Sequence, residues 1–519
     1  MTTRYLRREQ AVVAAQLPGP RKQADGRWRV PGDCCALIGL DTPALPELSA
    51  DEARHRIGAE IADVLGPLQF EDVHSLLRFG RGLLRHPTGT GKTLCGLAAA
   101  CGVPGSTLIV GPAISRTVWA RELTKWLGDD LVTLRGLTPD HAQLVGAHWV
   151  FVNYEVLLAW APTLACYAWD CLVLDEFHEL RSRKTQRMQG MLKALTFSPD
   201  CAIFGLSATP TWKSLSDLWN VLDLIYPRRF GTYSQFIAYY KGALPGQWGG
   251  LVEMGLTHGP ELRARLSSVI FSRTKAELLP DLPPLRRRVV GVEHPGASKR
   301  MATAAHALVS HLGETISDEA IEKLVKGVIR KETPRKIARL KDVLAACTDS
   351  KRLLVLCETR KDAEKAGIKL AALGLTVRSF HGGQPMAKRL EAIDAIRAFD
   401  GEGQAAVTCT GPSVMQSINA VGFDTVLMLD YPHTPEALLQ YEGRVHRRGG
   451  RSAEIIYVVV DHSYDEYVLN RLLGRLEERG AVLNLDANEE DLSAVLSGSA
   501  RDEEALGGML ARLGVEVGS

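Results

Sequence analysis

The chain has 519 residues, 45% hydrophobic and 24% charged, an ordinary composition for a globular protein long enough to form two or three domains. Its 62 basic and 60 acidic side chains leave a net charge of +2, so any nucleic-acid contact would depend on local basic patches. No segment approaches the ~18 uninterrupted apolar residues of a membrane helix. The ten cysteines include no C-x-x-C pair, which favours reduced core thiols over metal ligands.

The first residues are expected to form a small accessory element, because residues 1–50 are richer in Pro, Gly and Trp than the rest of the chain. Asp25-Gly26 lies between two short runs and predicts a hairpin turn. Trp28, with an arginine on each side, could stack on a nucleic-acid base or could equally pack against the next domain. The apolar run before Pro18 is short for a signal peptide, and Pro18-Gly19-Pro20 interrupts it, so we do not expect secretion.

A phosphate-binding loop is predicted at His86-Pro87-Thr88-Gly89-Thr90-Gly91-Lys92-Thr93. The apolar segment 82–84 before it is typical of a strand, and the segment 94–100 after it is typical of a helix. Glycines in such a loop let backbone N–H groups point at phosphate oxygens, while the lysine reaches the β- and γ-phosphates and the final threonine ligates Mg²⁺. The predicted nucleotide contacts are Thr88, Gly89, Thr90, Gly91, Lys92 and Thr93.

An acidic pair follows a second strand-like run, 171–174. Asp175 would hold the metal ion, and Glu176 would orient and activate the attacking water. Because the pair accompanies a P-loop, the sequence predicts a site that hydrolyses a nucleoside triphosphate with Mg²⁺.

Strand-like runs alternate with helical patterns in two sets, which predicts an α/β protein with two parallel sheets, each flanked by helices. The first set comprises Thr107–Val110, Trp149–Val152, Cys171–Leu174 and Ile203–Leu206. The second comprises Leu353–Cys357, Thr376–Phe380, Ala405–Thr408, Val426–Leu429 and Ile455–Val460. Between the sets, helices are expected at 214–225 and 233–240.

The domain boundaries follow from this alternation and from Pro283-Pro284, which favour an extended crossing. We expect an accessory element at 1–50, a first lobe at 51–282 that binds ATP, a second lobe at 283–480 and an acidic tail at 481–519.

Further motifs narrow the class of enzyme. Ser207-Ala208-Thr209-Pro210, Arg273-Thr274-Lys275, His381-Gly382-Gly383 and the segment 440–449 occur in the order and spacing of superfamily-2 helicases and translocases. The chain resembles the SWI/SNF-type ATPases, and within them the compact HARP-like annealing-helicase branch, over about residues 65–475. The resemblance implies two tandem RecA-like lobes, ATP and Mg²⁺ as cofactors, and DNA as the partner.

The resemblance also implies roles for single residues. Gln69 would bond the adenine edge, unless it is a solvated loop glutamine. Arg444 and Arg447 share a helix face and would neutralise γ-phosphate charge as arginine fingers, unless they form a solvated basic turn. Coupling of hydrolysis to movement would involve His178, whose alternative is a structural role, and also Ser207, Thr209 and Gln440.

Candidate DNA contacts lie in loops that the resemblance places on the DNA-facing side, where side chains would contact phosphates without reading bases. Basic residues in loops are often only solvated, so the alternative for each candidate is a solvent-exposed residue without a DNA contact. The candidates are Trp28, Arg116, Asn153, Tyr154, Arg183, Lys184, Thr359 and Arg360.

The sequence thus predicts a DNA-dependent ATPase that translocates on duplex, forked or single-stranded DNA in replication, recombination or repair. We expect a cytoplasmic monomer of a bacterial or phage-infected cell, with no membrane contact and with a possible replication or repair protein as partner. The alternatives are a strand-separating superfamily-2 helicase and the motor subunit of a restriction or antiviral complex.

Overall fold

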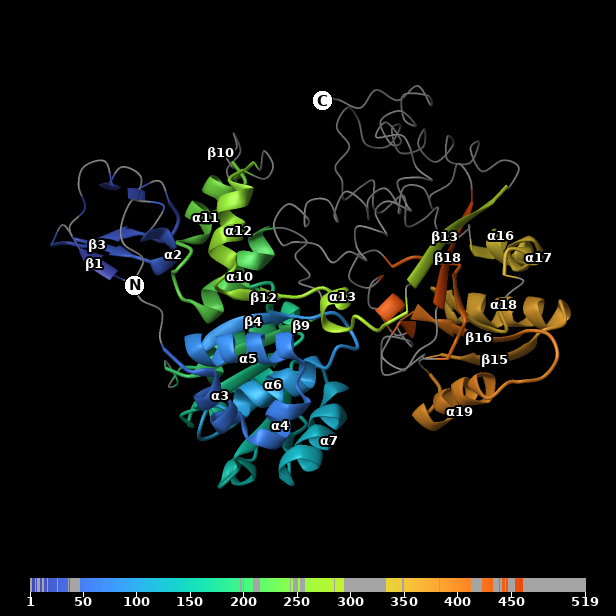
Figure 1. Cartoon of the computed structure of the whole chain (residues 1–519), viewed down its shortest axis with the longest axis horizontal. Coiled ribbons are helices and arrows are strands. Elements are labelled where there is room, and N and C mark those ends of the chain that lie inside the picture. Colours follow the sequence, from blue (N-terminus) through green and yellow to red (C-terminus); the bar gives the residue numbers. More distant parts are fainter. Residues whose placement is uncertain are drawn as a thin grey trace. The chain divides into compact units, whose positions relative to one another are not determined.

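The protein is described here from a computed structural model, drawn in Figure 1. The structure describes residues 2–37 with gaps, most of 47–293 and most of 333–460. The residues left out of the last two ranges are 197, 199, 209–214, 243, 246–250, 253–256, 284, 348–349, 382, 412–421, 433–437, 439–440, 444 and 447–452. The chain divides into two compact units, the first extending to Leu278 and the second beginning at Leu279. Each unit is described by itself.

A seven-stranded sheet forms the centre of the first unit, in the order β12-β4-β9-β8-β5-β7-β6, and every neighbouring pair is parallel. Four strands confirm the predicted runs, and a fifth confirms the strand before the P-loop. The short strands β6 and β12 were not predicted. The bounds are β4 (Arg81–Arg85), β5 (Thr107–Gly111), β6 (Val132–Leu134), β7 (Trp149–Asn153), β8 (Cys171–Asp175), β9 (Ala202–Ser207) and β12 (Ile270–Ser272).

Helices cover both faces of this sheet, because its central strands are apolar on both sides. Along β8, Leu172 and Leu174 belong to one hydrophobic cluster, and Cys171 and Val173 belong to the other. The second cluster is closed by α3 (Ala50–Ile57), α4 (Ala59–Val64), α5 (Pro67–Phe79), α6 (Lys92–Cys101) and α7 (Ser115–Leu127). The first is closed by α8 (Leu157–Leu164), α9 (Gln186–Ala194), α10 (Leu215–Ile225), α11 (Tyr233–Tyr240) and α12 (Gly259–Leu266).

Smaller elements complete the first unit. They are the short helices η2 (His141–Leu144), η3 (Phe177–Leu180) and α13 (Lys275–Leu278), and the strand pair β10 (Leu244–Pro245) and β11 (Leu251–Val252).

The second unit contains a six-stranded parallel sheet in the order β13-β18-β17-β14-β16-β15. Its strands are β13 (Leu285–Val292), β14 (Arg352–Cys357), β15 (Thr376–Phe380), β16 (Ala405–Thr410), β17 (Thr425–Met428) and β18 (Ala453–Val460). Its described helices include α16 (Thr333–Ala338), α17 (Leu340–Ala345), α18 (Arg360–Ala372) and α19 (Met386–Arg397). The two helix-flanked parallel sheets confirm the predicted α/β class.

The N-terminal element is a three-stranded antiparallel sheet of β1 (Thr2–Arg4), β3 (Trp28–Val30) and β2 (Arg21–Lys22), followed by α2 (Gly32–Cys35). The predicted hairpin joins β2 to β3, and the backbone N–H of Arg27 donates to the Asp25 carboxylate over 3.0 Å. Trp28 is half-buried against a small cluster of Ala14, Leu17, Val30 and Cys34. Tyr239 of α11 also packs on this cluster, and stacking of Trp28 on a base stays a prediction.

A buried ion-pair network fixes this element to α12. The Asp33 carboxylate accepts from Arg265 Nε over 2.7 Å and from Arg229 Nε over 2.9 Å. Arg265 is 1% exposed; its Nη1 donates to the Pro18 carbonyl at 2.8 Å and to the Tyr240 hydroxyl at 3.0 Å, and its Nη2 donates to the Arg229 carbonyl at 3.1 Å. The N-terminal element is therefore docked on the first unit through charge as well as apolar packing.

Replacing Asp33 with alanine is expected to lower the free energy of unfolding by about 3 to 5 kcal/mol, because it leaves the buried Arg265 guanidinium without its carboxylate. Urea denaturation would measure this loss, and limited proteolysis would release the N-terminal segment first. Asp25→Ala is the control, since its ion pair with Arg27 is exposed and contributes little. Equal stability of the two variants would contradict the anchoring role.

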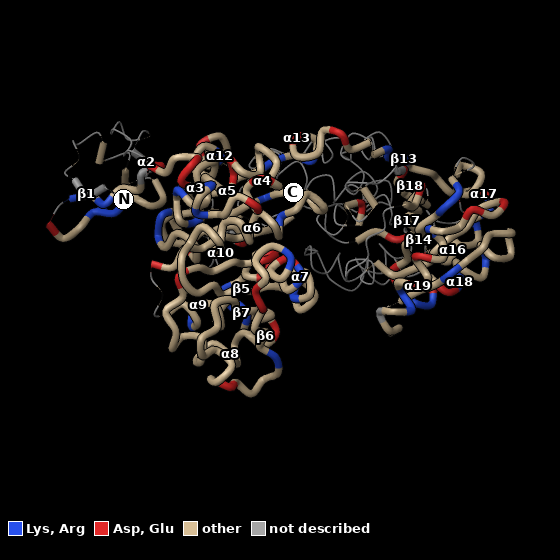
Figure 2. Tube along the Cα trace, turned by 60° about the horizontal axis from the view of Figure 1, so that its bottom comes forward, with Lys and Arg blue, Asp and Glu red and all other residues tan. Residues whose placement is uncertain are grey.

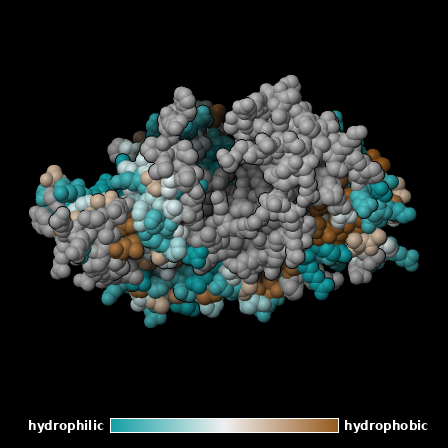
Figure 3. All heavy atoms as spheres, turned by 90° about the horizontal axis from the view of Figure 1, so that it is seen from above, coloured by the Kyte–Doolittle hydropathy of each residue, from teal (hydrophilic) through white to brown (hydrophobic). Residues whose placement is uncertain are grey.

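Among the residues that the structure describes, no helix has the length and apolar character needed to span a bilayer. On the face drawn in Figure 3, described hydrophobic residues gather in small patches between hydrophilic ones. The described cysteines are free thiols, and burial raises the pKa of most of them, for example Cys95 to about 12. The expected tail at 481–519 lies outside the described residues.

Candidate nucleotide site

The P-loop connects β4 to α6, as its pattern predicted. Gly89 and Gly91 adopt φ angles of 82° and 90°, a left-handed region that residues with a side chain rarely enter. Gly91 caps α6, which begins at Lys92. The Lys92 ammonium donates to the Pro87 carbonyl at 3.2 Å, and the Thr90 hydroxyl donates to the same carbonyl at 2.8 Å. Thr88 and Thr93 are half-buried beside them. The loop is thus folded back on itself around the lysine.

Gln69 lies in the first turn of α5, with both ends of its side-chain amide bonded to the protein. Its Oε1 accepts from the Gly66 N–H at 2.8 Å, and its Nε2 donates to the Thr90 carbonyl at 2.6 Å. A Cβ placed on Gly91 would lie 3.2 Å from that Nε2. Gln69 therefore holds the P-loop, rather than being a solvated loop residue. Its contact with adenine stays a prediction.

Asp175 is the last residue of β8. This strand pairs with β9, which in turn pairs with β4, the strand before the P-loop. Its carboxylate accepts from the indole N–H of Trp119 at 3.0 Å, and its backbone carbonyl accepts from the Tyr154 hydroxyl at 3.0 Å. Burial, and after it the negative charge of Glu176, raises the pKa of Asp175.

Glu176 is held in an unusual backbone conformation, with a φ of 52°. The Ser207 hydroxyl donates to its Oε2 at 3.2 Å, and Nδ1 of His178 lies 3.3 Å from both that oxygen and the Ser207 hydroxyl. Burial opposes ionisation of Glu176, but the hydrogen bond and charge of His178 and the charge of Lys92 outweigh it and lower the pKa. The structure therefore brings together the predicted water-activating residue and two of the predicted coupling residues.

One predicted DNA contact is wrong. Tyr154 is 2% exposed, and its hydroxyl is bonded inside the unit, so it is a core residue that supports Asp175. Its neighbour Asn153 is half-buried, and its amide donates to Glu155 at 2.6 Å.

The other candidate DNA contacts remain at or near the surface. Arg183 forms an ion pair with Asp223 and lies 4.8 Å above the Trp219 ring, while Lys184 is exposed. Arg116 is half-buried in α7. Figure 2 shows both basic and acidic residues along α7 and α18.

In the second unit, Thr359 caps the N-terminus of α18 by accepting from the Asp362 N–H at 3.2 Å. Arg360 is exposed and pairs with Glu364 at 2.8 Å. Both residues have a local structural partner. Thr359 would have to contact DNA in addition to capping α18, and Arg360 would have to exchange its exposed ion pair with Glu364 for a DNA phosphate.

Four predicted site residues lie outside the described residues, namely Thr209, Gln440, Arg444 and Arg447. The described residues between them show how that segment is held. Glu442 is buried and accepts from Arg287 Nε at 3.0 Å and from Arg287 Nη2 at 2.7 Å. The His446 ring nitrogen Nε2 lies 2.7 Å from the Pro283 carbonyl oxygen.

Sequence reasoning missed Trp119, which bonds Asp175, and Asp72, which bonds the first residue of the P-loop. Asp72 offered a signal, because an acidic residue within an apolar helical face requires a partner. Trp119 offered none, since an indole in an amphipathic helix is typical of core packing.

Most of the first unit and the beginning of the second match a family model. The model of the SNF2-related domain matches residues 42–344, which is more than half of the chain. The chain belongs to the SNF2-related family. The model of the helicase conserved C-terminal domain matches residues 335–449. The predicted resemblance to SWI/SNF-type ATPases is thereby confirmed.

Relatives of the chain include a SWI/SNF-related regulator of chromatin and a DNA annealing helicase. The chain is 23% identical over 86% of its length to the SWI/SNF-related matrix-associated actin-dependent regulator of chromatin subfamily A-like protein 1 of Xenopus tropicalis, covering 47% of that protein. It is 22% identical over 81% of its length to the DNA annealing helicase and endonuclease ZRANB3 of Mus musculus, covering 41% of it. The chain therefore spans less than half the length of these two relatives.

Among solved structures, the chain is similar to the Sulfolobus solfataricus SWI2/SNF2 ATPase core in complex with dsDNA. The TM-score is 0.40 at 17% identity, over 89% of this chain and 98% of the other.

Proposed function

We propose that this chain is an ATP-dependent DNA translocase, which couples ATP hydrolysis to movement on duplex or branched DNA in replication, recombination or repair, in the cytoplasm. The main support is the arrangement in the first unit, where a P-loop with two left-handed glycines accompanies an acidic pair whose second member is bonded to Ser207 and His178. Membership of the SNF2-related family supports DNA as the substrate on which it moves.

The residues present fit ATP with Mg²⁺. Backbone N–H groups at Gly89 and Gly91 and the positive end of α6 suit phosphate oxygens, and Lys92 is near enough to the loop to reach the β- and γ-phosphates. Thr93 and Asp175 would hold the metal ion, which when bound neutralises charge that develops on the phosphates.

Glu176 would act as the general base that takes the proton of the attacking water. The bonds from Ser207 and His178 fix the orientation of its carboxylate. Because Ser207 ends β9 and belongs to the predicted coupling motif, a shift of that motif would change the position of the base. The proposed link between hydrolysis and movement is this shared contact.

The second unit would supply Arg444 and Arg447 as arginine fingers, so that turnover requires both units. Hydrolysis would then release the contact between them, and repeated binding and release would advance the protein along one DNA strand. We propose that it acts as a monomer, with DNA as the main partner and a replication or repair protein as a further one.

ATPase assays with duplex DNA, forked DNA, single-stranded DNA and RNA test this function. We expect duplex or forked DNA to stimulate turnover most, and Lys92→Ala to abolish it with every nucleic acid. Stimulation that is strongest with RNA would overturn the proposed substrate and favour an RNA helicase of superfamily 2. Full activity that requires a co-purifying nuclease would favour a motor subunit of a restriction or antiviral complex.

A further inference from the structure

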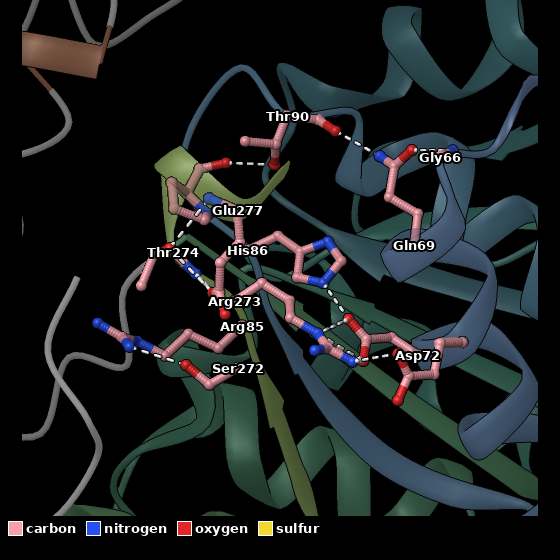
Figure 4. Close-up of polar contacts among 12 residues, drawn as sticks. Gly66, Gln69, Asp72, Arg85, His86, Thr90, Ser272, Arg273, Thr274 and Glu277 are labelled. Carbon is pink, nitrogen blue, oxygen red and sulfur yellow. Dashed lines mark hydrogen bonds and ion pairs between the residues drawn. The ribbon is translucent and has the colours of Figure 1, made fainter. Parts of the chain in front are cut away.

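Three elements of the first unit meet at one buried carboxylate, that of Asp72 in α5. Strands β4 and β12 are parallel and in register, with Arg85 opposite Ser272, so the residues that follow them emerge side by side. These are His86, the first residue of the P-loop, and Arg273. The Arg273 N–H donates to the Arg85 carbonyl at 3.2 Å, and Arg85 Nη1 donates to the Ser272 hydroxyl at 2.9 Å. Figure 4 shows the side chains of His86 and Arg273 pointing at Asp72.

Asp72 is 2% exposed and is bonded by both neighbours. Arg273 Nη2 donates to Oδ1 at 2.8 Å, and Arg273 Nε lies 3.1 and 3.0 Å from the two carboxylate oxygens. His86 Nε2 lies 2.8 Å from Oδ2. Because an ionised carboxylate can only accept, this His86 nitrogen carries the proton and donates. Arg273 thus pairs with Asp72 and, at 3.1 Å, with the Glu71 carboxylate as well, while burial lowers the pKa of His86.

His86 depends on Asp72 for its orientation. The imidazole is fully buried, and its other nitrogen, Nδ1, has no hydrogen-bond partner among the described residues. Gln69, on the same face of α5 and one turn before Asp72, holds the Thr90 carbonyl near the other end of the loop. One helix thus holds the P-loop at two points, with Asp72 at its start and Gln69 near its glycines.

Arg273 joins this arrangement to the crossing between the two units. The next residues form a short capped helix, α13, in which the Thr274 N–H donates to Glu277 at 2.7 Å and the Glu277 N–H donates to the Thr274 hydroxyl at 3.1 Å. This helix ends at Leu278, where the first unit ends. The four residues of this short capped helix are all that separate Arg273 and Thr274 from the crossing.

We propose that Asp72 and Arg273 are positioning residues that transmit the position of the interunit crossing to the P-loop. When the second unit moves, Arg273 displaces Asp72, and Asp72 displaces His86 at the start of the phosphate-binding loop. The proposal rests on the proposed ATPase function of the same loop. It adds a second connection between the units, separate from the arginine fingers.

The test uses the full chain with Arg273→Lys, which keeps the charge but removes the two-nitrogen contact with the carboxylate. Asp72→Glu is the second variant, because it keeps the charge and moves the carboxylate by one methylene. Arg265→Lys is the control, since it alters an arginine–carboxylate pair of the same unit away from the P-loop; its arginine side chain is 1% exposed, against 20% for Arg273. For each variant, turnover with and without duplex DNA, affinity for a fluorescent ATP analogue with Mg²⁺ and hydrogen–deuterium exchange are measured.

We expect DNA-stimulated turnover of Arg273→Lys to fall about 10²-fold, as for a reacting group misplaced by roughly 1 Å, while the affinity for the ATP analogue changes less than about 10-fold. Exchange at residues 85–91 should become faster in both P-loop variants and stay as in the wild type in the control. Wild-type turnover and exchange in Arg273→Lys and Asp72→Glu would overturn the proposal, as would exchange that rises equally throughout the first unit.

The exchange measurement separates this proposal from the proposed function. A wild-type chain that hydrolyses no ATP would contradict the proposed function alone. The link from Arg273 to the P-loop would then be supported by faster exchange confined to residues 85–91, and it would be refuted by unchanged exchange there.

Discussion

Replacing Glu176 with glutamine is expected to lower ATP turnover by about 10²- to 10⁴-fold, the usual contribution of a positioned general base. The amide keeps the size of the side chain and can still accept from Ser207, so the local fold should persist. It cannot take a proton from water. ATP and Mg²⁺ should bind with nearly wild-type affinity, which is measured with a fluorescent ATP analogue beside a phosphate-release assay.

The matched control is Glu179→Gln, the same substitution on the neighbouring short helix η3. Glu179 forms an ion pair with Arg187, and its Oε1 lies 3.9 Å from His178 Nε2. Its turnover should stay within about twofold of the wild type, as expected for a surface ion pair. If Glu176→Gln retains wild-type turnover, another group activates the water, and the assignment of the general base is wrong.

Arg447→Ala is expected to lower turnover by about 10³- to 10⁵-fold, the range found for arginine fingers. The loss should fall on the chemical step, because the guanidinium stabilises charge that develops on the γ-phosphate. Binding of the ATP analogue by the first unit should be largely retained. Single-turnover hydrolysis with excess protein would measure the chemical step directly.

Arg451→Ala is the control for this variant, since it removes a positive charge from the same stretch of sequence. It should retain turnover and nucleotide affinity. Normal hydrolysis by Arg447→Ala would remove the finger role. A loss of affinity as large as the loss of turnover would instead indicate that Arg447 binds ATP in its ground state.

Local sequence patterns predicted the strands and the P-loop well, because both depend on neighbouring residues. The run at 376–380 is a strand with those bounds, and the helix predicted at 233–240 is α11. The acidic pair was placed correctly at the end of a buried strand. The strands β6 and β12 were missed because each has only three residues, which is too short for a periodic pattern.

Contacts between distant residues could not be predicted from the sequence. The basic string at 273–275 was recognised as a family motif, but nothing in it indicated that Arg273 bonds a carboxylate in α5. Tyr154 was misplaced for a related reason. A tyrosine at the end of a strand can face solvent or the interior, and only the position of Asp175 in the folded unit shows that its hydroxyl has a partner inside.

The late position of β12 in the chain affects how the first unit can fold during synthesis. Arg85 and its partner Ser272 are 187 positions apart. At bacterial and eukaryotic elongation rates, β12 would leave the ribosome roughly 10 to 40 s after β4. During that interval β4 lacks its outer neighbour, and an unpaired strand edge can recruit other chains. The sheet edge beside the P-loop strand is therefore open to other chains at the stage when β4 has emerged and β12 has not.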